Sequence, residues 1–519
     1  MSDSMIALAF AKLPEYLGQH VLLSVSAIAI GFVISLPLAI AISRSTWLRG
    51  PALGLASIVQ TIPGLALLAL FYPLLLALSV FTERAFGFGF RALGFLPALL
   101  ALTLYSMLPV LRNTVTALAG IDPAIKTAAR GVGMTPWQSL VLVELPLAAP
   151  IIMAGLRTAS VWVIGTATLS TPVGQTSLGN YIFTGLQTEN WVFVLFGCIA
   201  AAVLALAIDR LLALAEDGFA LRSRVRLIIA AVGLAVIVGA SLSPLFGGEV
   251  RMVTVGTKGF EEQYTLGALI GDRLEKAGFK TVRRDGLGST VIFRALAAND
   301  VDVYVDYSGT LWTTQMKRAD APGRKVVLSQ LSAWLSQKYG IRDLGPLGFE
   351  NAYAFAMRAD RAKALGIETL GDLAAYAPRL KIGGDFEFFS RPEWNAVVKA
   401  YGIHFALQRQ YQANFMYRAL VDGDVDVIAA FSSDGRIAQY GLKLIGDPKQ
   451  ALPPYDAVLL VSPRHASDDR FLAALKPLIG SIDLKTMQQA NLMVDRADDK
   501  KTPEETASWL DQRIGQGGK

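Results

Sequence analysis

Residues 227–258 read LIIAAVGLAVIVGASLSPLFGGEVRMVTVGTK, and the character of the chain changes within this stretch. The residues up to Gly248 hold 22 charged side chains, whereas those after it hold 68. A run of about 20 apolar residues is long enough to cross a bilayer, and charged side chains stay in water. The sequence therefore predicts a transmembrane domain at 1–226, a last span with a linker at 227–249, and a water-soluble domain at 250–519.

The overall composition argues against several classes of protein. A net charge of +6 over 519 residues is too small and scattered for a nucleic-acid-binding protein. One cysteine and three scattered histidines supply neither a disulfide nor a metal cluster, so we expect no metal site. The motifs HExxH, GxSxG, GxxxxGKS and GxxxxGKT are absent from the sequence. We therefore expect no enzyme active site and no cofactor, and any ATP must be bound by a separate subunit.

Six apolar stretches in the first half are long enough to span a membrane. They are Val21–Ser43, Pro51–Thr82, Ala92–Leu111, Leu145–Pro172, Trp191–Ile208 and Leu227–Gly248. The second stretch exceeds one straight crossing, and we expect Pro63, Gly64 and Pro73 to kink it or to separate an interfacial piece. About six spans are therefore predicted.

The distribution of basic residues predicts the orientation of these spans. Lysines and arginines concentrate after the first, third and fifth spans, at Arg44, Arg49, Arg112, Lys126, Arg130, Arg210, Arg222, Arg224 and Arg226. Loops rich in Lys and Arg stay in the cytoplasm. We therefore expect a multi-pass protein of the cytoplasmic (inner) membrane, with the N-terminus and the water-soluble domain on the extracytoplasmic side.

The loop between the third and fourth spans has a distinctive sequence. It reads IDPAIKTAARGVGMTPW over 121–137, and ELPLAAP follows at 144–150. Pro123 suits the first turn of a short helix, and glycines suit its end. Because Ala128 and Ala129 are small, they permit close approach of another protein.

This loop resembles the one by which permeases of binding-protein-dependent ABC importers contact their ATPase. The family usually has glutamate before the two alanines, where this chain has Thr127. The resemblance implies a MetI-like helical permease fold and an ABC ATPase subunit docked at Thr127, Ala128, Ala129 and Gly133. It also implies a dimeric permease; we expect a second copy of this chain, although the sequence leaves a different partner open.

The second half alternates short strands and helices, as an α/β protein does. Strands are predicted at Val250–Gly256, Thr281–Arg284, Val301–Tyr307, Lys381–Gly384, Val425–Phe431 and Asp456–Val461. The chain is expected to cross twice between two lobes, near Tyr353–Met357 and near Tyr455–Val461. Lobe 1 is predicted at 250–355 and 458–519 and lobe 2 at 356–457, with a ligand cleft between them.

An ordered series of motifs resembles the substrate-binding proteins for glycine betaine, choline, carnitine and related osmoprotectants. The series is GTKGFEEQ at 256–263, GST at 288–290, YVDYSGT at 304–310, NAYA at 351–354, FSRP at 389–392, FSSDG at 431–435 and PPYD at 453–456. This transporter family also uses the fused order of permease and then receptor, including relatives that take up ergothioneine. A type II periplasmic-binding-protein fold is therefore expected.

The resemblance also implies which residues bind the ligand. A quaternary ammonium group has no hydrogen to donate, so aromatic faces hold it. The implied ring positions are Tyr307, Tyr353, Phe431 and Tyr455, with Phe431 in place of the usual tyrosine. Arg391 is the candidate clamp for a ligand carboxylate. The further polar candidates are Gln263, Thr290 and Asn351.

Two points stay open at the level of sequence. Glycine betaine, carnitine, choline and ergothioneine all fit these motifs. The alternative to an importer subunit is a membrane-anchored sensor that binds a ligand without transport. A sensor needs a cytoplasmic output domain, and the expected cytoplasmic loops are too short for one.

Overall fold

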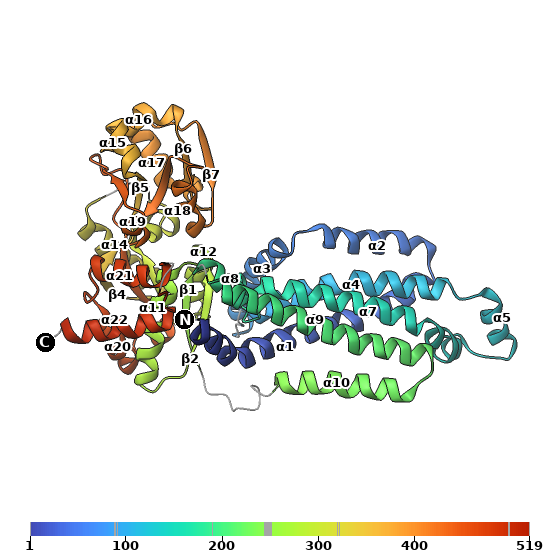
Figure 1. Cartoon of the computed structure of the whole chain (residues 1–519). Coiled ribbons are helices and arrows are strands. Elements are labelled where there is room, and N and C mark those ends of the chain that lie inside the picture. Colours follow the sequence, from blue (N-terminus) through green and yellow to red (C-terminus); the bar gives the residue numbers. More distant parts are fainter. Residues whose placement is uncertain are drawn as a thin grey trace. The chain divides into compact units, whose positions relative to one another are not determined.

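The computed structural model describes residues 2–517 apart from 88, 89, 91, 189, 243–251, 319, 321, 497 and 498. The chain divides into two compact units (Figure 1). One comprises Ile6–Phe183 and Val192–Glu249, and the other Met1–Met5, Thr184–Trp191 and Val250–Lys519. Residues 243–249, at the end of the predicted last span and linker, lie outside the described residues, so the limits of the domains stay predictions.

The first unit is helical. Six of its helices are long and apolar enough to cross a membrane, among the described residues. They are α1 (Ser2–Ser43), α3 (Gly64–Phe86), α4 (Phe95–Ala119), α7 (Leu145–Ala167), α9 (Trp191–Ala220) and α10 (Arg224–Leu242). A short helix, α8 (Gly179–Gln187), precedes α9. The predicted number of spans is confirmed, but the first helix begins nearly twenty residues before Val21, because the segment from Met5 is itself largely apolar.

The long apolar stretch Pro51–Thr82 divides into two helices. Helix α2 (Thr46–Thr61) ends just before Pro63, and α3 begins at Gly64. A proline disfavours helical backbone in the preceding residue, and Ile62 accordingly has an extended conformation with ψ 127°. The division at Pro63 agrees with the predicted split, whereas Pro73 stays inside α3.

One charged side chain within the fourth predicted span is paired. Arg157 of α7 donates to Asp209 through Nε at 3.0 Å and Nη2 at 3.1 Å. Its Nη1 donates to Glu216 at 2.8 Å, and both carboxylates belong to α9. Pairing lowers the cost of charge in a membrane helix. The interruption of this span by Arg157 is therefore compatible with a crossing.

The second unit contains two five-stranded sheets in its described residues. The sheet of lobe 1 has the order β2-β1-β3-β10-β4, and that of lobe 2 has the order β7-β6-β8-β5-β9. The strands of lobe 1 are β1 (Val253–Lys258), β2 (Thr281–Leu287), β3 (Val303–Tyr307), β4 (Arg342–Glu350) and β10 (Asp456–Val461). Those of lobe 2 are β5 (Tyr353–Arg358), β6 (Lys381–Gly384), β7 (Leu407–Gln410), β8 (Val427–Phe431) and β9 (Leu442–Ile445).

Each sheet combines parallel and antiparallel pairs. In lobe 1, β1 pairs in parallel with β2 and β3, and β10 is antiparallel to β3 and β4. In lobe 2, β6 pairs in parallel with β7 and β8, and β5 is antiparallel to β8 and β9. The two antiparallel strands, β5 and β10, follow the two passages of the chain between the sheets. The predicted lobe limits at 355/356 and 457/458 lie inside these strands.

Helices accompany both sheets. Those of lobe 1 are α11 (Glu261–Lys276), α12 (Ser289–Ala297), α13 (Ser308–Thr310), α14 (Arg324–Tyr339), α20 (Asp469–Leu475), α21 (Leu484–Asp495) and α22 (Pro503–Gly517). Those of lobe 2 are α15 (Ala359–Leu365), α16 (Leu370–Tyr376), α17 (Pro392–Tyr401), α18 (Ala413–Val421) and α19 (Arg436–Gln439). The predicted strands occur within a few residues of their predicted positions. Strands β4, β5, β7 and β9 have no counterpart among the predicted strands, although the segment of β5 was predicted as a passage between the lobes.

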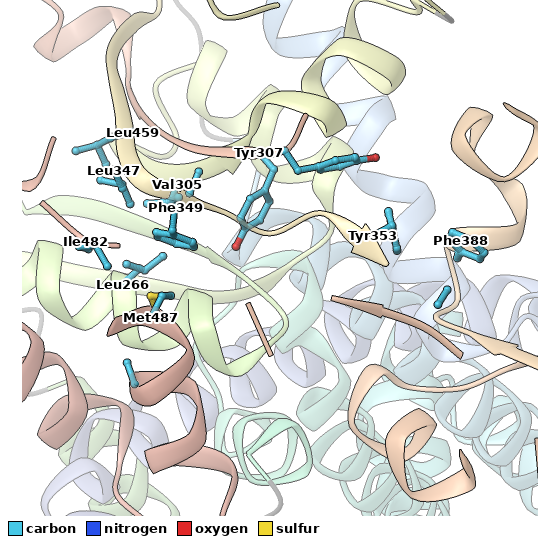
Figure 2. Packing of buried hydrophobic residues seen from close by; sticks show 14 of the residues in the cluster. Leu266, Val305, Tyr307, Leu347, Phe349, Tyr353, Phe388, Leu459, Ile482 and Met487 are labelled. Atoms are coloured by element: carbon cyan, nitrogen blue, oxygen red, sulfur yellow. The ribbon is translucent and has the colours of Figure 1, made fainter. Parts of the chain in front are cut away.

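A cluster of buried apolar side chains continues from one lobe into the other. In Figure 2, Val305 and Phe349 belong to the lobe 1 part, and Tyr307, Tyr353 and Phe388 follow toward lobe 2. Aromatic side chains therefore lie where the two lobes meet.

Candidate functional site

The four predicted ring positions lie in one chain of aromatic contacts, to which Phe260 adds a fifth ring. Tyr455 meets Tyr353 edge-on with 5.8 Å between ring centroids, and Tyr353 lies 5.2 Å from Phe431. Phe431 is stacked at 6.4 Å on Phe260, which is stacked at 6.1 Å on Tyr307. The structure thus brings all four predicted rings together.

Strand ends explain this convergence. Tyr307 ends β3, Phe431 ends β8, Tyr353 begins β5, and Tyr455 directly precedes β10. Main-chain pairing places Tyr353 opposite Phe431 in the sheet of lobe 2. Gly309 belongs to the same arrangement, because a Cβ atom there would lie 2.6 Å from the ring of Tyr455.

A buried carboxylate, Glu262, joins the elements around the rings. Its Oε1 accepts from the hydroxyl of Tyr307 at 2.5 Å and from Asn351 Nδ2 at 3.2 Å. Its Oε2 accepts from Ser433 Oγ at 2.6 Å and from Asn491 Nδ2 at 2.9 Å. Burial raises the pKa of Glu262, and these four donors oppose that shift. Because Ser433 belongs to lobe 2, Glu262 is also a contact between the lobes.

The remaining polar candidates, Gln263, Asn351 and Thr290, differ in how they lie relative to the rings. Gln263 Nε2 donates to the hydroxyl of Tyr307 at 2.9 Å, so it supports one of the rings. Asn351 lies between β4 and β5, and its backbone N–H donates to Tyr455 O at 3.0 Å. Thr290 is exposed on α12, and no hydrogen bond joins it to the rings among the described residues. Gln263 and Asn351 are therefore hydrogen-bonded to Tyr307 or Tyr455, whereas the role of Thr290 stays a prediction.

Arg391, the candidate carboxylate clamp, is buried and paired within the protein. Its Nη2 donates to Glu387 at 2.5 Å, and its Nη1 lies 3.7 Å from Glu393 Oε1. Its guanidinium carbon lies 5.5 Å from the centroid of the Tyr353 ring. Glu387 is half exposed, whereas Glu393 is fully buried. Arg391 therefore lies beside the rings, with one solvent-accessible partner and one buried one.

Glu393 is a second buried carboxylate beside the rings. The hydroxyl of Tyr455 donates to it, and Thr313 Oγ1 donates to its Oε1 at 2.9 Å. Thr313 belongs to lobe 1, and Glu393 lies in the first turn of α17 in lobe 2. Burial raises the pKa of the Tyr455 hydroxyl, so this group stays a neutral donor. Lobe 2 thus contacts lobe 1 at Glu393 as well as at Ser433.

Sequence reasoning missed Phe260, Glu262 and Glu393. The first two lie within the GFEEQ segment that pointed to the family, and Glu393 follows the FSRP motif directly. Acidic residues are mostly exposed in proteins, so sequence alone gave no reason to bury these two. Their position inside or next to a motif was the available signal.

Three further carboxylates could by spacing hold a metal ion. Glu261, Asp434 and Asp495 each place one oxygen within 4.8 Å of the others, and all three are buried. Arg436 lies 2.5 Å from Glu261, 2.6 Å from Asp434 and 3.5 Å from Asp495. The positive charge beside these three carboxylates is therefore the guanidinium of Arg436.

The predicted ATPase-docking loop forms a short helix, α5 (Pro123–Gly131). Asp122 caps it by accepting from the Ala124 N–H at 2.8 Å, and Gly133 beyond it has φ +85°. Thr127, Ala128 and Gly133 are exposed, but Ala129 is buried within its own domain.

After α5 the chain forms α6 (Pro136–Ser139) and a π-helical turn, Leu140–Glu144, before α7. Val132 and Trp137 around this turn are 75% and 71% exposed. The loop therefore offers an apolar surface that the sequence-based list of docking residues did not include.

Comparisons with known proteins give one family match for each half of the chain. A family described as the substrate binding domain of ABC-type glycine betaine transport system matches residues 251–512. A family described as binding-protein-dependent transport system inner membrane component matches residues 30–220.

Curated relatives match the whole chain or its first half. The ergothioneine transport permease/ergothioneine binding protein EgtU of Helicobacter pylori (strain G27) is 29% identical over 486 residues, which cover 90% of this chain and 84% of the relative. The glycine betaine/carnitine/choline transport system permease protein OpuCB of Bacillus subtilis (strain 168) is 40% identical over 199 residues, which cover 38% of this chain and 84% of the relative.

Among solved structures, a crystal structure of a glycine betaine/carnitine/choline ABC transporter protein is 28% identical with a TM-score of 0.44, covering 51% of this chain and 98% of that one. The family matches together span most of the sequence, with the membrane component first and the receptor second. The chain therefore belongs to the family of substrate-binding domains of ABC-type glycine betaine transport systems, joined here behind a transport-system inner-membrane component.

Proposed function

We propose that this chain is both the permease and the receptor of an ATP-driven importer for compounds that carry a trimethylammonium group, such as glycine betaine, carnitine, choline or ergothioneine. The observation that carries the proposal is the chain of five aromatic rings, from Tyr455 to Tyr307, where the lobes meet. Aromatic faces attract a cation by about 0.5–2 kcal/mol per contact. Relatives named for these compounds support the ligand class.

The charges beside the rings suit a zwitterion. Glu262 and Glu393 are buried carboxylates that favour a cation nearby, and Arg391 supplies a guanidinium for an anionic group. Glu387 is half exposed, so a ligand carboxylate can replace it at Arg391. A compound with both an ammonium and a carboxylate group then meets a partner for each.

The remaining parts of the importer follow from the membrane half. An ABC ATPase subunit that binds ATP docks at α5 and the exposed side chains of Val132 and Trp137. A second copy of this chain completes the permease, and the receptor half faces the extracytoplasmic side of the inner membrane. The match of 30–220 to a transport component favours import over a membrane-anchored sensor.

Calorimetric titration of the full chain in lipid nanodiscs tests the ligand class. We expect at least one of glycine betaine, carnitine, choline and ergothioneine to bind, and dimethylglycine, which lacks one methyl group, to bind more weakly than glycine betaine. Failure of all four compounds to bind would refute the proposal. A reporter that fluoresces only in the cytoplasm, fused after Lys519, should stay dark; a bright reporter would overturn the orientation.

A further inference from the structure

A second buried polar cluster connects the two lobes beside the rings. Glu261 begins α11 and Asp495 ends α21, both in lobe 1, whereas Asp434 and Arg436 follow β8 in lobe 2. Arg436 Nη2 lies 2.5 Å from Glu261 Oε1 and 2.6 Å from Asp434 Oδ2, and its Nε lies 3.5 Å from Asp495 Oδ2. The exposed fraction of these side chains is 6% or less. We call these four residues the inter-lobe cluster.

Backbone packing holds the lobe 2 part of the cluster against lobe 1. Gly435, directly before Arg436, packs closely on α21. A Cβ atom at this position would lie 2.7 Å from the backbone nitrogen of Leu492. Gln488 Nε2 donates to Ser432 O at 2.9 Å, and Asn491 Nδ2 donates to Ser433 O at 2.8 Å. These contacts hold the turn after β8 against α21, so the cluster joins lobe 2 to lobe 1 in this structure.

The charges of the inter-lobe cluster do not balance. Three ionised carboxylates and one guanidinium give a formal charge of −2, and burying uncompensated charge is costly. Arginine stays protonated in proteins, so only the carboxylates can adjust. Burial raises the pKa of Glu261 and raises that of Asp495 well above its ordinary value, although Arg436 opposes both shifts. Protonation of Glu261 and Asp495 is therefore favoured in the assembled cluster, and it reduces the net negative charge.

Other charged and titratable groups around the cluster are few. The Tyr417 ring of α18 lies 4.4 Å from the guanidinium carbon of Arg436, and burial raises the pKa of its hydroxyl, which stays neutral. Lys500 acts on Asp495 from beyond α21 and favours its ionised form, though less strongly than Arg436 does. Glu262, next to Glu261, already accepts four hydrogen bonds from its own partners. Glu261 and Asp495 therefore stand out as the proton acceptors.

We propose that closing the two lobes takes up protons at Glu261 and Asp495, with Arg436 as the positioning residue, so that ligand capture by this receptor is coupled to pH. Two-lobed binding proteins close around ligands by hinge motion, and opening would return these carboxylates to water. Proton-coupled closure goes beyond the proposed ligand class, and it depends only on the opening and closing of the lobes.

The direction of the pH effect follows from proton linkage. The pKa values of Glu261 and Asp495 are raised in the assembled cluster. If opening returns both carboxylates to water, the closed state binds more protons than the open state between the ordinary and the raised values. The closed population is then largest at low pH and declines as the pH rises through the raised values. Each proton taken up changes the ratio of closed to open by at most about tenfold per pH unit.

Pulsed electron paramagnetic resonance on the full chain in nanodiscs measures this ratio. Spin labels are placed at Ser336→Cys on α14 in lobe 1 and Gln408→Cys on β7 in lobe 2, in a Cys198→Ser background; both labelled positions are exposed. Without ligand, we expect the short-distance population to increase several-fold from pH 8 to pH 5. A population that is constant over this range would overturn the proposal.

Amide variants separate proton coupling from a merely structural role. Asp495→Asn and Glu261→Gln keep the size of the side chain, and each should flatten the pH dependence of the distance population. The matched control is Asp511→Asn, whose carboxylate pairs with Arg273 and Lys276 inside lobe 1, and which should keep the full dependence. If both cluster variants retain the wild-type dependence while remaining folded, the assignment is wrong.

A titration with ligand distinguishes failure of this inference from failure of the proposed function. Titration with glycine betaine in two buffers of different ionisation enthalpy should show protons taken up on binding, and less uptake in Asp495→Asn. Failure of every trimethylammonium compound to bind would refute the ligand class but leave the ligand-free distance measurement intact. Binding without proton uptake would refute the coupling and leave the ligand class standing.

Discussion

The ring of Phe260 lies parallel to that of Phe431, with 6.4 Å between the centroids and 2° between the ring planes. Phe260 directly precedes α11 in lobe 1, and Phe431 ends β8 in lobe 2. The pair thus extends the series of aromatic contacts from one lobe to the other. A ligand held by both rings would therefore contact both lobes.

Phe260→Ala should weaken the binding of a trimethylammonium ligand. Loss of one aromatic face removes about 0.5–2 kcal/mol, which is roughly 2–30-fold in Kd. Phe260→Tyr keeps the face and should bind nearly as well as wild type. Titration calorimetry on the full chain measures the effect. Phe279→Ala, which loses a ring that packs on Phe471 inside lobe 1, is the control and should leave Kd unchanged.

Tyr353 contacts the rings of Phe388, Phe431 and Tyr455. Its substitutions distinguish the contribution of the ring face from that of the hydroxyl. Tyr353→Ala should cost about 1–2 kcal/mol or more, roughly 5–30-fold in affinity. Tyr353→Phe should cost less affinity, although it removes a donor to the partly buried Asp385 at 3.0 Å and so lowers the thermal stability. Equal binding by wild type and both variants would show that Tyr353 does not hold the ligand.

Arg391→Ala should distinguish ligands by their carboxylate. Glycine betaine presents a carboxylate to the guanidinium and choline does not, so the loss in affinity should be far larger for glycine betaine. Glu387→Gln removes the exposed partner of Arg391 and serves as the companion variant, with an expected gain in glycine betaine affinity. The same loss for both ligands in Arg391→Ala would mean that Arg391 acts only through Glu393.

Gly133→Leu should disrupt docking of the ATPase and so abolish both uptake and the stimulation of ATP hydrolysis. Its φ of +85° is unfavourable for a side chain, and the residue is exposed directly after α5. Uptake and ligand-stimulated ATPase activity in proteoliposomes should be lost, while the ligand Kd of the receptor half stays at the wild-type value. Normal uptake by this variant would move the docking site elsewhere.

Asp343 in β4 should make the receptor half less stable as the pH rises. Burial raises the pKa of Asp343 to about 6, against the hydrogen bond from the Gly345 N–H. The folded state then binds more protons than the unfolded state between about pH 4 and 6, so the free energy of unfolding decreases over that interval and is level above it. Asp343→Asn should remove this decrease in Tm, measured by tryptophan fluorescence. The exposed Asp424→Asn should preserve it.

Much of the receptor fold could be predicted because its strands carry strong local signals. Val303–Tyr307 and Val427–Phe431 are short runs rich in β-branched and aromatic residues that end in motif residues, and the structure has strands at these positions. β7, which reads LQRQ, is exposed along its length, so its sequence has no apolar pattern to recognise. Its pairing with β6 is a tertiary effect that local sequence does not encode.

The rings of the candidate site were predictable for a similar reason, since each belongs to a motif. The buried carboxylates were not, because burial of Glu262 depends on donors from four separate segments, one of them Asn491, more than 200 residues away. The exposed position of Thr290 has the same origin, because a motif fixes residue order but not which face of α12 turns inward.

Ten residues separate the end of α10 at Leu242 from the start of β1 at Val253. A receptor tethered this closely encounters its permease at an effective concentration on the order of millimolar, whatever the cell's expression level. Weak docking between the two then suffices. The stoichiometry is also fixed at one receptor per permease, so a cell cannot increase uptake by secreting surplus receptor and must synthesise more of the whole transporter.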